Sequence, residues 1–450
     1  MFQEMRLRHV EKLVERGRVR LTGKVQIADS EELDVWFEYA DEFADFICES
    51  GDAFVPALLI ASMYRAEKLD IEVPISYRLF SNIARLQDIY SQFHPKKLTK
   101  IQFTAAQYEE LARSSNIYVG AFFSLGVDSF YTLHKDMTGR LADSPPISHL
   151  IYMTGLELPL RRYNQNQEDA VKSTVSLVAK EAKKNCIFGS TNVRDALLNF
   201  GWGLYCYGAG LASVALSLSE RLGHVLINST HPYTYVIPWG SSPMFDHLWS
   251  SEKVNIVHIG SEVGRAEKIY YSLSNDALAM KYLRTCVANE GGVGNCGCCY
   301  KCTRTMTSLY IAGKLGRVPV FPSRLDWRAL KKDFVTRNDL GYAEENLKLA
   351  KEHSKDKRLT RLLERQIEDA KAEEFFRGKT FVKALVLTVS WCLFTAPKQR
   401  VIRFLRNVLR RMEGKSEFWA TVVAFLRKRR RKYGPRNAPP HEVDDATLRP

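Results

Sequence analysis

Short apolar segments that alternate with helical segments constrain the fold of this chain more than any other feature. Five of them are typical of β-strands, at residues 117–123, 148–154, 186–191, 224–230 and 254–259. Helical sequences separate most of these strands, and strands joined through helices pair in parallel by right-handed crossovers. The pattern therefore predicts an α/β fold with a doubly wound, Rossmann-like parallel sheet. Ligands of such sheets bind beyond the carboxyl ends of the strands, so we expect the loop after the first strand at an active site.

The remaining sequence suggests further segments around this core domain at 111–325. Residues 1–110 carry alternating strand-like stretches and an apolar helical run, which predict an N-terminal α+β accessory domain. Residues 326–376 are rich in charged helix formers and are typical of a helical linker. Basic amphipathic helices are predicted at 377–436, and a disordered tail at 437–450.

Positive charge is concentrated in the segment 377–436. It holds 17 lysines and arginines against two glutamates, a net charge of +15, while the whole chain carries +14. The main body is nearly neutral, so net charge gives no reason to expect a nucleic-acid surface there. Apolar and basic residues share helical spacing in the tail, which leaves an anionic membrane surface and nucleic acid open as partners. Its longest uncharged run, the 14 residues 384–397, is shorter than the ~20 that a spanning helix needs.

The first 20 residues are charged throughout and lack the apolar core of a signal peptide. We therefore expect a cytoplasmic protein, with peripheral attachment to the inner face of the membrane through the tail as an option. Five of the nine cysteines lie within 17 residues. In a reducing compartment, such a group favours a bound metal over disulfides.

Four of these cysteines have the spacing C-x9-C-x2-C-x2-C, which suits a closed tetrahedral Zn²⁺ site with Zn–S bonds of ~2.3 Å. Such a site has no open coordination position for catalysis, so the zinc would be structural. The segment around it would form a zinc-binding lobe. A redox dithiol and an iron–sulfur cluster are the alternatives, and Cys298 is a fifth thiol that could exchange with a neighbouring cysteine as ligand. The predicted ligands are Cys286, Cys296, Cys299 and Cys302.

The loop after the first strand has the composition of an anion-binding nest. Gly126 allows a close approach of the backbone to a phosphate, while Ser124 and Ser129 offer hydroxyl donors. The N–H groups at the following helix start, from Val127 onward, face negative charge. Asp128 is placed either to cap the helix or to help hold a Mg²⁺ bridged to phosphate oxygens.

This segment, Ser-Leu-Gly-Val-Asp-Ser, resembles the SGGxDS loop of the PP-loop ATP pyrophosphatases, which include asparagine synthetase, GMP synthetase, tRNA-thiolating enzymes and 7-cyano-7-deazaguanine synthase. Leu125 stands where that family usually has its first glycine, so its side chain must point away from the nucleotide or distort the loop. The resemblance implies cleavage of ATP between the α and β phosphates and transfer of AMP to a substrate oxygen. Residues 264–269 resemble the family segment that supplies a cation to the phosphates, which points to Arg265 first and Lys268 second; ordinary solvated charges at a helix start are the alternative.

The cysteine run Cys296-Gly-Cys-Cys-Tyr-Lys-Cys302 is similar to the CGxCxxC zinc site of 7-cyano-7-deazaguanine synthases. The pairing of a PP-loop with this cluster ~160 residues downstream is more specific than either motif. Between them lies an aromatic segment, 231–249, whose walls suit a flat heterocycle or an amide. A loop that merely packs against helices is the other reading. The substrate candidates are Trp239, Ser241, Ser242 and Asp246.

The resemblance to these families implies two enzymatic functions, and the departure at Leu125 leaves a third function open. The first is an ATP-dependent carbon–nitrogen ligase that adenylates a small-molecule or protein-borne carboxylate, such as a deazapurine acid, with ATP, Mg²⁺ and Zn²⁺ as cofactors. The second is sulfur transfer to tRNA, with the cysteines partly reactive. The third is a nucleotide-binding module in which Leu125 has ended catalysis and the tail recruits a membrane or nucleic acid. A homodimer is compatible with each.

Overall fold

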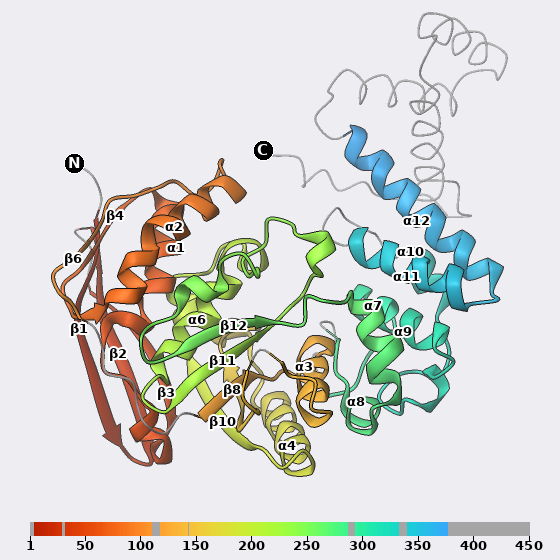
Figure 1. The fold of residues 1–450 in the computed structure, drawn as a ribbon, viewed down its shortest axis with the longest axis horizontal. Helices are drawn as coiled ribbons and strands as arrows, with labels where there is room; N and C mark the ends of the chain where they lie inside the picture. Colours follow the sequence, from red (N-terminus) through yellow and green to blue (C-terminus); the bar gives the residue numbers. More distant parts are fainter. Residues whose placement is uncertain are drawn as a thin grey trace, which may run out of the picture. The chain divides into compact units, whose positions relative to one another are not determined.

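The computed structural model describes residues 4–28, 32–109, 118–142, 144–286, 293–332 and 340–376 (Figure 1). The chain forms two compact units, Met1–Leu330 and Lys331–Pro450. The basic helices predicted at 377–436 and the tail predicted at 437–450 lie outside the described residues.

A mostly parallel sheet of ten strands forms the centre of the first unit, in the order β12-β11-β8-β9-β10-β3-β2-β1-β4-β6. A small second sheet pairs β5 with β7. The strands are β1 (Glu4–Glu15), β2 (Arg18–Ile27), β3 (Leu33–Ala40), β4 (Lys68–Ile71), β5 (Ile75–Ser76), β6 (Phe103–Ala105), β7 (Tyr108–Glu109), β8 (Tyr118–Phe122), β9 (His149–Thr154), β10 (Asn185–Thr191), β11 (Leu222–Asn228) and β12 (Asn255–Ile259).

The five strands predicted from the sequence correspond to β8, β9, β10, β11 and β12. All four pairings among them are parallel. In chain order their arrangement is 3-2-1-4-5, with the first strand, β8, between β9 and β11. The chain therefore reverses its direction of winding between β8 and β11, and this switch point is where open α/β sheets form their ligand crevice.

Helices cover both faces of the parallel half, as a doubly wound sheet requires. Alternate side chains of β9 belong to different cores: Ile151 and Met153 pack with α6, whereas Leu150 and Tyr152 pack with α3 and α4. The helices of this unit are α1 (Val55–Arg65), α2 (Tyr77–Phe93), α3 (Val127–Met137), α4 (Gln165–Glu181), α5 (Val193–Ala196), α6 (Tyr207–Ser217), α7 (Arg265–Glu267), α8 (Ala277–Tyr282), α9 (Tyr300–Ile311) and α10 (Trp327–Lys332), the last of which extends across the unit boundary.

The N-terminal segment 1–110, which the sequence sets apart as an accessory domain, contributes strands to this same sheet. β3 pairs antiparallel with β10, and β2 and β1 follow it as antiparallel neighbours. β4 and β6 then add parallel strands at the far edge. One hydrophobic core runs through both segments, since Phe54 and Leu58 share a cluster with Leu216 and Val225.

The second unit contains two described helices, α11 (Leu340–His353) and α12 (Lys357–Phe376), in the segment predicted as a charged helical linker. They contact each other, and the ion pairs Lys351–Glu364 and Lys371–Glu344 join their exposed faces. Of the helices that the structure describes, none combines the length and the hydropathy needed to cross a bilayer.

Candidate functional site

The predicted phosphate loop lies between β8 and α3, at the switch point of the sheet (Figure 1). Gly126 is the residue before the helix and has extended backbone angles, φ −78° and ψ 167°. A Cβ added there would meet only the Ser124 hydroxyl, at 3.2 Å. The protein itself therefore leaves the space beside Gly126 nearly open. The first N–H groups of α3 have no helical carbonyl to bind, which makes this end of the helix suitable for an anion.

Leu125 occupies the loop with a left-handed backbone, φ +62°. Its side chain is fully buried and packs into the core with Val127 and Phe130. Its carbonyl oxygen accepts a hydrogen bond from the Arg284 N–H at 2.8 Å. The leucine thus takes the backbone conformation that glycine adopts most readily, and its side chain belongs to the core beneath the loop.

The two serines hold the loop together. The Ser129 hydroxyl donates to the Gly126 carbonyl at 3.0 Å, and the Ser124 N–H donates to the Ser129 hydroxyl at 3.4 Å. Ser129 is buried, whereas Ser124 is exposed. Ser129 therefore supports the loop from inside, and Ser124 is the hydroxyl that solvent can reach.

Asp128 meets the two cations that the sequence points to. Its carboxylate accepts hydrogen bonds from the Arg265 guanidinium and, at 3.1 Å, from the Lys268 ammonium. Burial by itself would raise the pKa of Asp128, but Arg265 and Lys268 outweigh it and hold this pKa below its usual range. Both cations come from the segment after β12, so residues ~140 positions apart in the chain form one charged cluster.

Lys268 is almost completely buried and begins a π-helical turn, η7 (Lys268–Ser272). Its ammonium also donates to the Ser229 carbonyl, at 2.8 Å, just beyond β11. The Arg265 Nε is buried and, among the described residues, has no hydrogen-bond partner. A buried donor without a partner is costly, so this atom is available to a ligand.

Asn228 and Ser229 are site residues that the sequence analysis did not single out. The Asn228 amide donates to the Phe122 carbonyl at 2.6 Å and so joins the ends of β11 and β8. Its Oδ1 atom is buried, and within the described part of the chain it has no partner. The sequence feature that could have identified Asn228 and Ser229 is their position at the end of the predicted strand 224–230, since the loops after parallel strands form the ligand site.

Aromatic residues line the region beyond β11. The ring of His231 contacts Trp239 edge-on, with centroids 5.7 Å apart, and Trp239 also lies close to Gly203. Burial lowers the pKa of His231 to about 4; Asp128 opposes this effect, while Arg304, Lys268 and Arg265 add to it. His231 is therefore neutral at pH 7.

The other three substrate candidates form a separate buried network. The Ser241 hydroxyl donates to the Asp246 carboxylate at 2.6 Å, and the Ser242 N–H bonds the same carboxylate at 3.2 Å. His258 on β12 completes the network, 2.7 Å from Asp246. Asp246 is fully buried, so in this structure its hydrogen bonds serve the folding of the loop.

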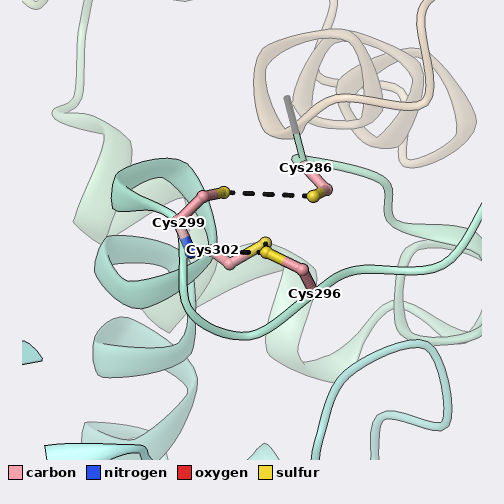
Figure 2. Close-up of side chains that lie close together, drawn as sticks. All are labelled: Cys286, Cys296, Cys299 and Cys302. Carbon is pink, nitrogen blue, oxygen red and sulfur yellow. Dashed lines mark hydrogen bonds between the residues drawn. The ribbon is translucent and has the colours of Figure 1, made fainter. Parts of the chain in front are cut away.

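Four cysteine sulfurs lie together at the start of α9, all within 4.8 Å of one another, and could hold a metal ion (Figure 2). Two of the separations, Cys296–Cys302 and Cys286–Cys299, are 3.9 Å. A tetrahedral site with Zn–S bonds of ~2.3 Å has S–S edges of ~3.8 Å, so this set of donors fits Zn²⁺. The exposed Cys298 lies 3.6 Å from Cys296, outside the group of four.

Asn295 fixes the backbone around this cluster. Its Oδ1 accepts from the N–H groups of Thr285 and Cys286, at 2.8 and 3.1 Å. Its Nδ2 donates to the carbonyls of Leu283 and Val320, at 2.9 and 3.0 Å. At Cys296, burial tends to raise the thiol pKa, but the N–H groups of the following residues outweigh it and lower the pKa to about 6. A thiolate is the form that binds metal.

Comparison with protein-family models, curated proteins and solved structures found no match to this chain. The site combines an open glycine loop before a helix, two buried cations on a carboxylate and neighbouring aromatic residues, at the switch point of an α/β sheet.

Proposed function

We propose that this chain is an ATP-dependent ligase that resembles 7-cyano-7-deazaguanine synthase and adenylates a carboxylate. The observation that carries the proposal is the cluster of Asp128, Arg265 and Lys268 beside an open glycine loop at the sheet's switch point. The carboxylate substrate is a deazapurine acid or a similar small or protein-borne acid.

In this proposal the loop and the two cations bind the phosphates of ATP. The N–H groups at the start of α3 approach phosphate oxygens beside Gly126, which has no side chain to block them. Arg265 and Lys268 exchange their contacts with Asp128 for contacts with the phosphates and neutralise charge on the departing pyrophosphate. The released carboxylate of Asp128 is the type of oxygen ligand that Mg²⁺ prefers, and when bound the ion would offset phosphate charge.

The proposed reaction has two steps. First, a carboxylate oxygen of the substrate attacks the α-phosphorus of ATP, the bond between the α-phosphorus and the bridging oxygen breaks, and pyrophosphate leaves with that electron pair. Next, a nitrogen nucleophile attacks the acyl carbon, loses a proton, and displaces AMP. Holding the reactants in line accounts for most of the expected acceleration, because the loop supplies no covalent group of its own.

The acceptor is expected on the aromatic side of the site. His231 and Trp239 provide flat surfaces beyond β11, and the neutral imidazole of His231 adds no charge to repel a nitrogen nucleophile. The four-cysteine cluster is proposed to hold Zn²⁺ as a structural ion, because four thiolates leave no open coordination position.

Product formation tests the proposal directly. We expect ATP and 7-carboxy-7-deazaguanine, incubated with the full chain, Mg²⁺ and ammonia, to yield AMP and pyrophosphate. Lys268→Met should reduce this release at least 100-fold, and Lys180→Met, at an exposed position of α4, should not change it. A wild-type chain that releases no pyrophosphate with any carboxylate tried would contradict ligase activity.

Sulfur transfer to tRNA remains the second candidate because Cys298 is an exposed thiol beside the cluster. A persulfide that forms on a cysteine by transfer of sulfane sulfur from a persulfide donor, and that is lost in Cys298→Ser, would favour sulfur transfer over the ligase.

A further inference from the structure

Helix α9 connects the cysteine cluster to the phosphate site. The helix begins directly after Cys299 and contains Cys302, and it contacts both α7 and η7, which carry Arg265 and Lys268 (Figure 1). A second connection runs through Arg284, which lies two residues before Cys286. Its N–H donates a hydrogen bond to the Leu125 carbonyl in the phosphate loop. The cysteine cluster is therefore linked both to the phosphate loop and to the segment that carries Arg265 and Lys268.

Lys301 lies between two of the cysteines, in the first turn of α9. It is half-buried, and within the described part of the chain its ammonium makes no hydrogen bond and no ion pair. Helix α9 packs against α7 and η7, so its first turn lies near the phosphate site. Burial lowers the pKa of Lys301; Glu157 and Asp128 oppose this effect, while Arg304 and Arg265 add to it. Taking an ammonium partly out of water without a partner is unfavourable, and an anionic ligand would offset that cost.

Arg304 follows three residues later, so it lies on the same face of the helix as Lys301. Its guanidinium is 5.7 Å from the centre of the Tyr300 ring, and its charge acts on both Asp128 and His231. Arg304 therefore belongs to the same electrostatic environment as the phosphate loop.

Several charged groups of the described residues act on one another in this region. Lys301 and Arg304 add two positive charges to those of Arg265 and Lys268. Two carboxylates act on the same groups, Asp128 and Glu157, and the second is already 3.5 Å from the guanidinium of Arg284. Cations that gather beside an open glycine loop suit a ligand that carries several negative charges.

We infer that Lys301 and Arg304 form an oxyanion subsite of the phosphate site, and that the metal-bound cysteine cluster positions them by fixing α9. This inference rests on the proposed function. The oxyanion has two possible sources, the phosphates of ATP and the carboxylate of the acceptor, which share the same chemistry toward a lysine and an arginine.

Calorimetric titration of the full chain with pyrophosphate, AMP and 7-carboxy-7-deazaguanine separately distinguishes the sources. Lys301→Met should weaken binding of at least one of the three about tenfold or more, and Lys301→Arg should restore most of it. Loss of pyrophosphate or AMP affinity would assign the subsite to ATP, and loss of acceptor affinity would assign it to the carboxylate. Lys180→Met is the matched control for a lost lysine charge.

Each negative result has a separate meaning. If the wild type binds the probes and both Lys301→Met and Arg304→Met bind all three equally well, the subsite is wrong and the proposed function stands. If the wild type binds none of the three, the proposed function fails, and the subsite fails with it. Zinc content and thermal unfolding show whether each variant is folded. If Lys301→Met loses its metal, the affinities of Arg304→Met decide whether the subsite exists.

Discussion

Leu125 allows the loop geometry to be tested by stability alone. Its backbone has φ +62° and its side chain is fully buried. Replacing a buried leucine by alanine costs ~2–5 kcal/mol of unfolding free energy. A Cβ on a residue in the left-handed region costs ~1 kcal/mol. Leucine and alanine both carry this cost, and glycine does not. We therefore expect both Leu125→Ala and Leu125→Gly to destabilise the protein, with the glycine variant the more stable of the two by about 1 kcal/mol.

This order is the reverse of the usual one, since glycine is ordinarily the less stable replacement. Urea denaturation followed by circular dichroism measures the difference between the two variants. Pyrophosphate affinity of Leu125→Gly should stay within about threefold of the wild type, because the glycine keeps the same backbone shape. Equal or greater stability of Leu125→Ala would refute the assignment of a left-handed backbone, and wild-type stability of both would refute the burial.

Three further predictions concern the loop, the metal and pH. Gly126→Ala should change the unfolding free energy by less than about 1 kcal/mol, because its Cβ meets only the Ser124 hydroxyl. The same variant should weaken pyrophosphate binding more than tenfold in calorimetry. Unchanged affinity would exclude a close approach of phosphate to Gly126. Elemental analysis should find one zinc per chain, lost in Cys299→Ser but kept in Cys298→Ser, and zinc retained in the first variant would contradict the ligand set. The pKa of His231 is lowered to about 4, so between pH 4 and 6.5 the unfolded state binds more protons than the folded state. The free energy of unfolding should therefore rise with pH over this range. An equal slope in His231→Phe would exclude His231 as the cause.

The sequence predicts the parallel half of the sheet well because its strands are buried on both faces and read as continuous apolar runs. The five strands, the helices between them and the position of the loop all follow from that pattern. The pairing of β3 with β10 joins residues ~150 positions apart, and no local pattern encodes such a contact. For this reason the accessory segment could not be recognised as part of the same sheet.

Site residues were predictable to different extents. The cysteine spacing led directly to four sulfurs that could hold a metal ion, because short loops allow few other arrangements. Ser241, Ser242 and Asp246 were chosen for their polarity, and polarity alone does not distinguish a side chain that faces a ligand from one that bonds its own loop. Lys301 could not be chosen from sequence, since its proximity to Asp128 depends on how α9 packs.

The loop after β8 is proposed to bind the phosphates of a nucleotide. A crystal structure of the full chain with AMP, pyrophosphate and Mg²⁺ tests this binding most directly. We expect pyrophosphate beside Gly126, hydrogen-bonded to N–H groups at the start of α3, with Arg265 and Lys268 turned from Asp128 toward it. Pyrophosphate bound elsewhere, or a loop left empty at saturating concentration with both cations still on Asp128, would contradict the claim.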